Sequence, residues 1–146
     1  MTEAENTIRQ REREIVEEFS LFDDWMGRYE YLIDMGKSLP PLPEEDHVDE
    51  YKIQGCQSQV WIKPEKRNGT IHFEGDSDAL ITRGLVALLI RVVDAQPPEA
   101  IADADFGFLE EIGMQDHLSP TRKNGLASMV RQMKLYGLAY ASSDTK

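Results

Sequence analysis

Residues 51–76, with the sequence YKIQGCQSQVWIKPEKRNGTIHFEGD, decide the fold, because apolar and polar side chains alternate there as they do in half-buried strands. The apolar side of each expected strand is a pair of residues two positions apart: Tyr51 and Ile53, Val60 and Ile62, and Ile71 and Phe73. Gly55-Cys56 separates the first pair from the second, and Asn68-Gly69 is the dipeptide most typical of a tight hairpin. The segment therefore predicts three short antiparallel strands in a meander.

Helical periodicity precedes this segment. Apolar residues recur at helical spacing over about residues 3–19 and again over about residues 22–36, which predicts two amphipathic helices. Gly36 is the expected stop of the second helix, since glycine commonly ends helices. The prolines at positions 40, 41 and 43 then predict an extended connection to the first strand.

The chain after the predicted strands is mostly helical. Residues 80–93 are apolar on nearly every side, which predicts a central buried helix that ends before Pro97-Pro98. Asp76-Ser77-Asp78 is the expected cap of that helix, and capping leaves its two aspartates no chemical role. Ser119-Pro120 predicts the start of a last helix. The expected fold is a single compact α+β domain over residues 1–146, with helices on one face of the sheet.

The composition restricts the classes of partner. The chain has 146 residues and a net charge of −11, and a polyanion would be repelled by that average field, so nucleic-acid binding is not expected. The longest apolar run, residues 84–90, is far shorter than the roughly 20 residues that span a bilayer. Residues 1–14 lack the apolar centre of a signal peptide. We therefore expect a cytoplasmic protein without a membrane segment. The basic residues gather in two groups, interpreted as solvated helix faces: Arg9, Arg11 and Arg13, and Arg122, Lys123, Arg131 and Lys134.

A single cysteine, Cys56, excludes an internal disulfide and a thiolate-rich zinc or iron–sulfur site. The histidines, His47, His72 and His117, are far apart in the sequence and form no ligand-spaced motif, so no metal is expected. Cys56 follows Gly55, which permits a sharp turn, and precedes uncharged polar residues that can donate hydrogen bonds to a thiolate. A thiolate is the nucleophile of sulfur exchange. The alternative at this point is a structural cysteine, because free cysteines are usually buried.

Three segments carry a resemblance to a known family. They are GCQSQVWI at residues 55–62, FEGDSDA at residues 73–79 with GLVALL at residues 84–89, and HLSPTRKNGL at residues 117–126. In this order they resemble the SufE/CsdE family of sulfur acceptors for cysteine desulfurases. Residues 19–31 and the LPPLP stretch at residues 39–43 are also similar to it, so the resemblance extends over nearly the whole chain. It implies a SufE/IscU-like fold, with a three-stranded sheet packed against several helices.

The resemblance also implies a function. Cys56 would accept persulfide sulfur from a SufS/CsdA-type desulfurase, stimulate that enzyme and pass sulfur to an iron–sulfur scaffold or another acceptor. The pyridoxal phosphate would belong to the desulfurase, so this chain would need no cofactor and would not be a stand-alone catalyst. Arg122 matches a family arginine near the cysteine or the partner interface, where its charge would favour a thiolate or persulfide anion.

Three other functions remain open at this point. The chain could be an adaptor that activates a desulfurase without carrying sulfur, and substitution of Cys56 distinguishes the two. It could be a thiol redox sensor, which the absence of a second, resolving cysteine disfavours. A cysteine hydrolase with His117 as base would need an orienting group and an oxyanion site, and the sequence indicates neither.

Overall fold

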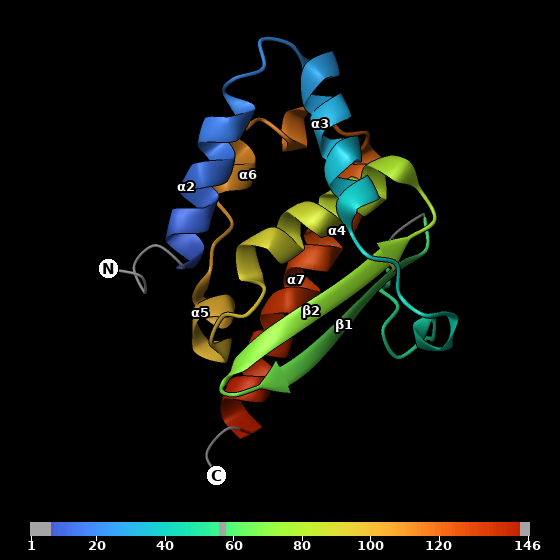
Figure 1. Ribbon diagram of the computed structural model, residues 1–146, viewed down its shortest axis with the longest axis vertical. Helices are drawn as coiled ribbons and strands as arrows, with labels where there is room; N and C mark the ends of the chain where they lie inside the picture. Colours follow the sequence, from blue (N-terminus) through green and yellow to red (C-terminus); the bar gives the residue numbers. More distant parts are fainter. Residues whose placement is uncertain (1–6, 56–57, 144–146) are drawn as a thin grey trace.

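A two-stranded antiparallel hairpin and six helices make up residues 7–55 and 58–143, which the computed structural model describes (Figure 1). The helices are α2 (Ile8–Phe19), α3 (Trp25–Ser38), α4 (Leu80–Val93), α5 (Pro98–Asp103), α6 (Phe108–Glu111) and α7 (Pro120–Ser143). The strands are β1 (Val60–Arg67) and β2 (Thr70–Ser77), and short 3₁₀ turns lie at Glu44–Asp46 and Gln115–His117. The described residues thus form one α+β domain.

The hairpin forms where its turn dipeptide predicts it. Arg67 pairs with Thr70 across the turn, so Asn68 and Gly69 are the only residues outside the ladder. Both have positive φ, 53° and 84°, as the tightest two-residue hairpin turn requires. The register brings Val60, at the start of β1, opposite Ser77, at the end of β2. Gln59 and Val60 therefore lie beside the residues that lead into α4.

The prediction of a third strand is wrong. Residues 51–53 make only one isolated bridge to β1, between Lys52 and Trp61. Ile53 donates its N–H to Val60 at 2.8 Å, and Tyr51 accepts from Ile62 at 2.9 Å. Turn hydrogen bonds precede the bridge, and Gly55 follows it with φ +90°. The alternating pattern is present in the sequence, but the turns on both sides leave the segment too short to form a strand.

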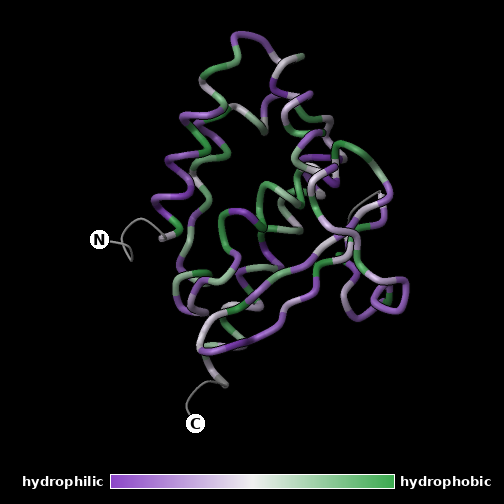
Figure 2. Tube along the Cα trace, viewed as in Figure 1, coloured by the Kyte–Doolittle hydropathy of each residue, from purple (hydrophilic) through white to green (hydrophobic). Residues whose placement is uncertain are grey.

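Helix α4 forms the centre of the core, as its apolar sequence predicts. Nine of its residues are buried, and hydrophobic residues predominate along it (Figure 2). It packs against the hairpin, α2, α3 and α7. Gly36 belongs to this packing and is not a stop, because a Cβ there would lie 2.8 Å from the backbone nitrogen of Gly84. The glycine lets α3 approach α4 closely, and α3 continues to Ser38.

The observed helix starts follow local capping rules at three places. Thr7 caps α2, so residues 8–19 of the expected first helix are confirmed and residues 3–6 lie outside the described residues. Asp24 caps α3 by accepting from the N–H of Gly27 at 2.9 Å, so that helix begins at Trp25 and not at Phe22. Ser119 accepts from the N–H of Arg122 at 3.3 Å, which confirms the predicted start of α7. Within the described ranges, no helix combines the length and the apolar character needed to cross a membrane.

Candidate functional site

The predicted reactive residue, Cys56, lies with Gln57 outside the described residues, so the site is built from the chain on either side of them. Gly55 is the last described residue before Cys56. A Cβ added to it would lie 2.7 Å from the hydroxyl of Ser128 on α7, and its φ of +90° is one that side chains other than glycine rarely adopt. The chain therefore enters the cysteine position in close contact with α7.

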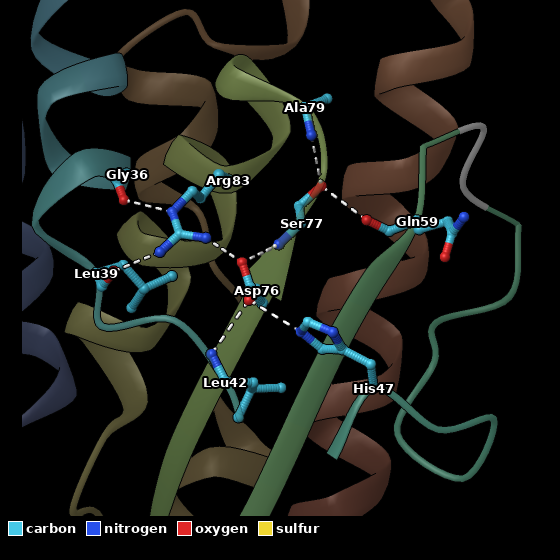
Figure 3. A network of polar contacts seen from close by, with 9 residues as sticks. All are labelled: Gly36, Leu39, Leu42, His47, Gln59, Asp76, Ser77, Ala79 and Arg83. Atoms are coloured by element: carbon cyan, nitrogen blue, oxygen red, sulfur yellow. Dashed lines mark hydrogen bonds and ion pairs between the residues drawn. The ribbon is translucent and has the colours of Figure 1, made fainter. Parts of the chain in front are cut away.

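On the other side of Cys56, Gln59 is hydrogen-bonded to residues at the end of β2 and directly after it. The backbone N–H of Gln59 donates to the Asp78 carboxylate at 3.1 Å. The carbonyl of Gln59 accepts from the hydroxyl of Ser77 at 2.8 Å (Figure 3). The same carbonyl accepts from the N–H of Asp78 at 3.3 Å. The Ser77 hydroxyl also accepts from the N–H of Ala79, where α4 begins, at 3.3 Å. These bonds fix Gln59, three positions after Cys56, to the strand–helix junction.

A cavity of about 200 Å³ lies beside these anchors, and we call it the Arg122 cavity. It is lined by Ser58, Thr82, Leu85, Ser119, Thr121, Arg122, Gly125 and Met129. Four of these residues carry hydroxyl groups, which can donate hydrogen bonds to an anion. The Arg122 guanidinium and the positive end of α7, which begins at Pro120, add positive electrostatic potential. The arrangement suits a small anion such as a thiolate or persulfide.

Asp76 holds the surrounding segments together, and its predicted role as a helix cap is wrong. Its side chain is 8% exposed; one oxygen forms an ion pair with Arg83 and the other lies 3.0 Å from His47 Nε2. It also accepts from the backbone N–H groups of Ser77 and Leu42, at 2.9 and 3.1 Å (Figure 3). Burial opposes its ionisation, yet these hydrogen bonds and the charge of Arg83 hold the pKa of Asp76 below its usual value.

Arg83 extends this network to the end of α3. Its guanidinium donates to the carbonyl of Gly36 at 2.8 Å and to that of Leu39 at 2.5 Å. The N-cap position of α4 is Ala79, which makes no side-chain capping bond. The aspartates before α4 therefore serve a different purpose from the predicted one: Asp76 joins three segments, and Asp78 anchors Gln59.

Comparisons with known proteins identify the family of this chain. Residues 13–137 match the family model described as SufE, Fe-S metabolism associated domain. The chain belongs to the SufE family. Uncharacterised SufE-like proteins of Rhizobium etli and of a Synechocystis strain are 43% and 39% identical over 126 residues. These matches cover 83% and 86% of this chain, and 85% and 79% of the relatives. A hypothetical protein from Thermus thermophilus, solved in solution, shares the fold with a TM-score of 0.75 at 17% identity, over 90% of this chain and 96% of its own.

In this SufE-family chain, Arg122 and Ser58 line one cavity although they are far apart in the sequence. The resemblance singled out Arg122, and its chemical role stays a prediction. We call residues 55–59 the cysteine segment. Sequence reasoning missed Ser77 and Asp78, which anchor its last residue, Gln59. The signal was Asp78, the acidic residue directly after β2, but its contact with Gln59 becomes visible only when the hairpin register places Ser77 opposite Val60.

His117 packs among the aromatic residues of α3. Its ring stacks on Trp25 with the centroids 3.8 Å apart, and its Nδ1 lies 3.2 Å from the carbonyl of Gly113. Its own carbonyl accepts from the Tyr29 hydroxyl. His117 is not among the residues that line the Arg122 cavity. These contacts give His117 a packing role and lend no support to a cysteine hydrolase.

Proposed function

We propose that this chain accepts persulfide sulfur on Cys56 from a pyridoxal-phosphate-dependent cysteine desulfurase and passes it on for iron–sulfur cluster assembly. One observation carries the proposal: Ser58, two positions after Cys56, lines the same cavity as Arg122 and the hydroxyl groups of Ser119 and Thr121. That cavity offers an anionic sulfur group a cation and several hydrogen-bond donors. Membership of a family associated with iron–sulfur metabolism supports the same reaction.

The proposed transfer is an exchange between two sulfur groups. The Cys56 thiolate attacks the outer sulfur of a persulfide on the desulfurase, and a new sulfur–sulfur bond forms on Cys56. The original sulfur–sulfur bond breaks, and its electron pair leaves with the desulfurase cysteine as a thiolate. The proton of the persulfide moves with the transferred sulfur, so no outside oxidant or reductant is needed. The pyridoxal phosphate stays on the desulfurase, and we place the exchange in the cytoplasm.

Arg122 and the start of α7 would assist this exchange electrostatically. A guanidinium near a sulfur atom favours the thiolate over the neutral thiol, and the thiolate is the reactive form. The same charge would then stabilise the anionic form of the persulfide. The chain as a whole is strongly acidic, with a net charge of −11, and this charge would steer it toward a basic patch on the desulfurase.

The decisive experiment is mass spectrometry of the chain after incubation with a SufS/CsdA-type desulfurase and cysteine. We expect the wild type to gain about 32 Da on Cys56, roughly one sulfur atom by the exchange chemistry. Cys56→Ser should gain nothing and should lose the stimulation of the desulfurase. Stimulation retained by Cys56→Ser would instead identify an adaptor that carries no sulfur. An unchanged mass for the wild type, with an active desulfurase, would refute the transfer.

A further inference from the structure

A second concave surface lies between the segment before α6 and the outer side of α7, and we call it the α7 groove. Its volume is about 440 Å³. Phe106 and Leu109 form one wall, and Leu126, Val130 and Leu135 form the other. Phe106 is 4% exposed and has a positive φ of 56°, an uncommon conformation for a bulky residue. The floor of the groove is therefore apolar and made of buried side chains.

The rim of the α7 groove is basic. Helix α7 contains four basic residues and no acidic one, whereas all 27 acidic residues of the chain lie elsewhere. Arg131 and Lys134 border the groove, and neither makes an ion pair with a described residue. Asp105 is the only acidic residue among those that line the groove in the described part of the chain. A chain with a net charge of −11 thus presents a local positive surface here.

The apolar character of the groove continues along the exposed side of α7. Leu135 and Leu138 are 48% and 55% exposed. They are three residues apart, so they lie next to each other on one side of the helix. Single exposed leucines are common, but a pair that extends an apolar groove makes a longer contact surface. The groove and these leucines together offer a strip that an apolar helix face can cover.

We propose that the α7 groove binds an amphipathic helix of a partner protein, one whose apolar face is flanked by acidic residues. The apolar face would cover Phe106, Val130 and Leu135, as in other helix-in-groove complexes. Its carboxylates would pair with Arg131 and Lys134 at the rim. Charge complementarity selects this occupant, because a basic helix would meet like charges at the same rim.

This binding would not interfere with the Arg122 cavity. Arg122 and Arg131 are nine residues apart on α7, about two and a half helical turns, so they point to opposite sides of the helix. A partner in the α7 groove could therefore stay bound while another protein contacts the cysteine segment. The inference about the groove does not depend on sulfur transfer.

Two synthetic peptides of about 18 residues test the proposal, each helical with leucines along one face. One carries glutamates beside the leucines and the other carries lysines at the same positions. In fluorescence anisotropy at about 150 mM salt, where long-range fields are screened, we expect the glutamate peptide to bind about tenfold more tightly, the effect of a few exposed ion pairs. The net charge of the chain favours the lysine peptide, so this preference can arise only from a local basic site.

Variants locate the site. Arg131→Glu with Lys134→Glu should reverse the preference, and Leu135→Asp should weaken both peptides without unfolding the chain, because Leu135 is half exposed. The matched control is Arg9→Glu with Arg13→Glu, an equal charge change on exposed residues of α2, which should leave the preference in place. Equal or tighter binding of the lysine peptide by the wild type would overturn the proposal. So would self-association of the wild type that Leu135→Asp abolishes, because a second copy would then be the occupant.

Discussion

The carboxylates of Asp76 and Glu12 differ in how their charge is compensated. The side chain of Asp76 is 8% exposed and has a partner for each oxygen: Arg83 on one side, His47 and the N–H of Leu42 on the other. Glu12, on α2, lines a crevice of about 640 Å³ with Asp105 and Glu111, and its Oε2 has no hydrogen-bond partner among the described residues. One carboxylate stabilises the fold next to the cysteine segment, while the other opposes the packing of α2.

The pKa shifts follow this difference. Burial opposes ionisation of Asp76, but its hydrogen bonds and Arg83 hold its pKa below the ordinary 3.8. Ionised Asp76 therefore adds to the free energy of unfolding above that pH, and this stabilisation is lost as the pH falls below it. Burial and the negative charges of Asp105 and Glu111 raise the pKa of Glu12 to about 7. The folded state binds a proton there that the unfolded state releases near pH 4.5. Protonated Glu12 is compatible with the folded state, so the free energy of unfolding falls as the pH rises from about 4.5 through 7 and Glu12 becomes charged.

The largest expected effect is that of Asp76→Ala. The substitution leaves Arg83, with a side chain only 18% exposed, without its counter-charge and leaves the N–H of Leu42 without an acceptor. Breaking a buried ion pair on one side typically costs about 3–5 kcal/mol, and we expect a loss of that size in the free energy of unfolding, measured with urea at pH 7. Asp103→Ala, which removes an exposed carboxylate, should change the free energy of unfolding by less than about 0.5 kcal/mol. A similar value for both variants would contradict the role of Asp76.

A smaller effect is expected from Ser77→Ala, which removes a hydrogen bond to Gln59 and keeps the side-chain contacts of Asp76. Ser77→Ala removes the hydroxyl that donates to the carbonyl of Gln59, and the lost hydrogen bond should cost about 1 kcal/mol in the free energy of unfolding. The amide of Gln59 should also exchange its hydrogen faster, because one of the bonds that fix this residue is gone.

The matched control lies at the other end of the hairpin. Thr70 also donates its hydroxyl to a carbonyl, that of Arg67 at 3.0 Å, but in an exposed turn. Thr70→Ala should cost less than Ser77→Ala and leave the exchange of Gln59 unchanged. Unchanged exchange at Gln59 in Ser77→Ala would show that the hydroxyl does not hold the cysteine segment.

The sequence predicted features that depend on a few neighbouring residues. Asn68-Gly69 specifies its turn by backbone conformation alone, and Ser119-Pro120 specifies the start of α7 by one local hydrogen bond. The burial of α4 followed from its composition. Each of these features needs no information about the rest of the fold.

The failures concern residues whose partners are distant in the sequence. Gly36 has the local pattern of a helix stop, but its role is set by contact with Gly84. Asp76 resembles a cap, but its partners include His47 and Leu42, which the hairpin and the proline-rich connection bring to it. Arg122 came from the resemblance to a family, and only the folded chain brings it beside Ser58. The anchors of the cysteine segment could be found only after the strands were paired.

The smallest expected effect is a gain in stability from Glu12→Gln. Glutamine keeps the size of the side chain and removes the charge that Asp105 and Glu111 oppose, with only Arg9 acting in the other direction. The variant should therefore be more stable than the wild type at pH 8, and the difference should shrink toward pH 5, where Glu12 is protonated in the folded state. Thermal unfolding at both pH values measures it, with Glu14→Gln as the control, because Glu14 is exposed on the same helix. An equal gain in stability at the two pH values would mean that Glu12→Gln acts through packing and not through charge. The proposed contrast with the compensated charge of Asp76 would then be wrong.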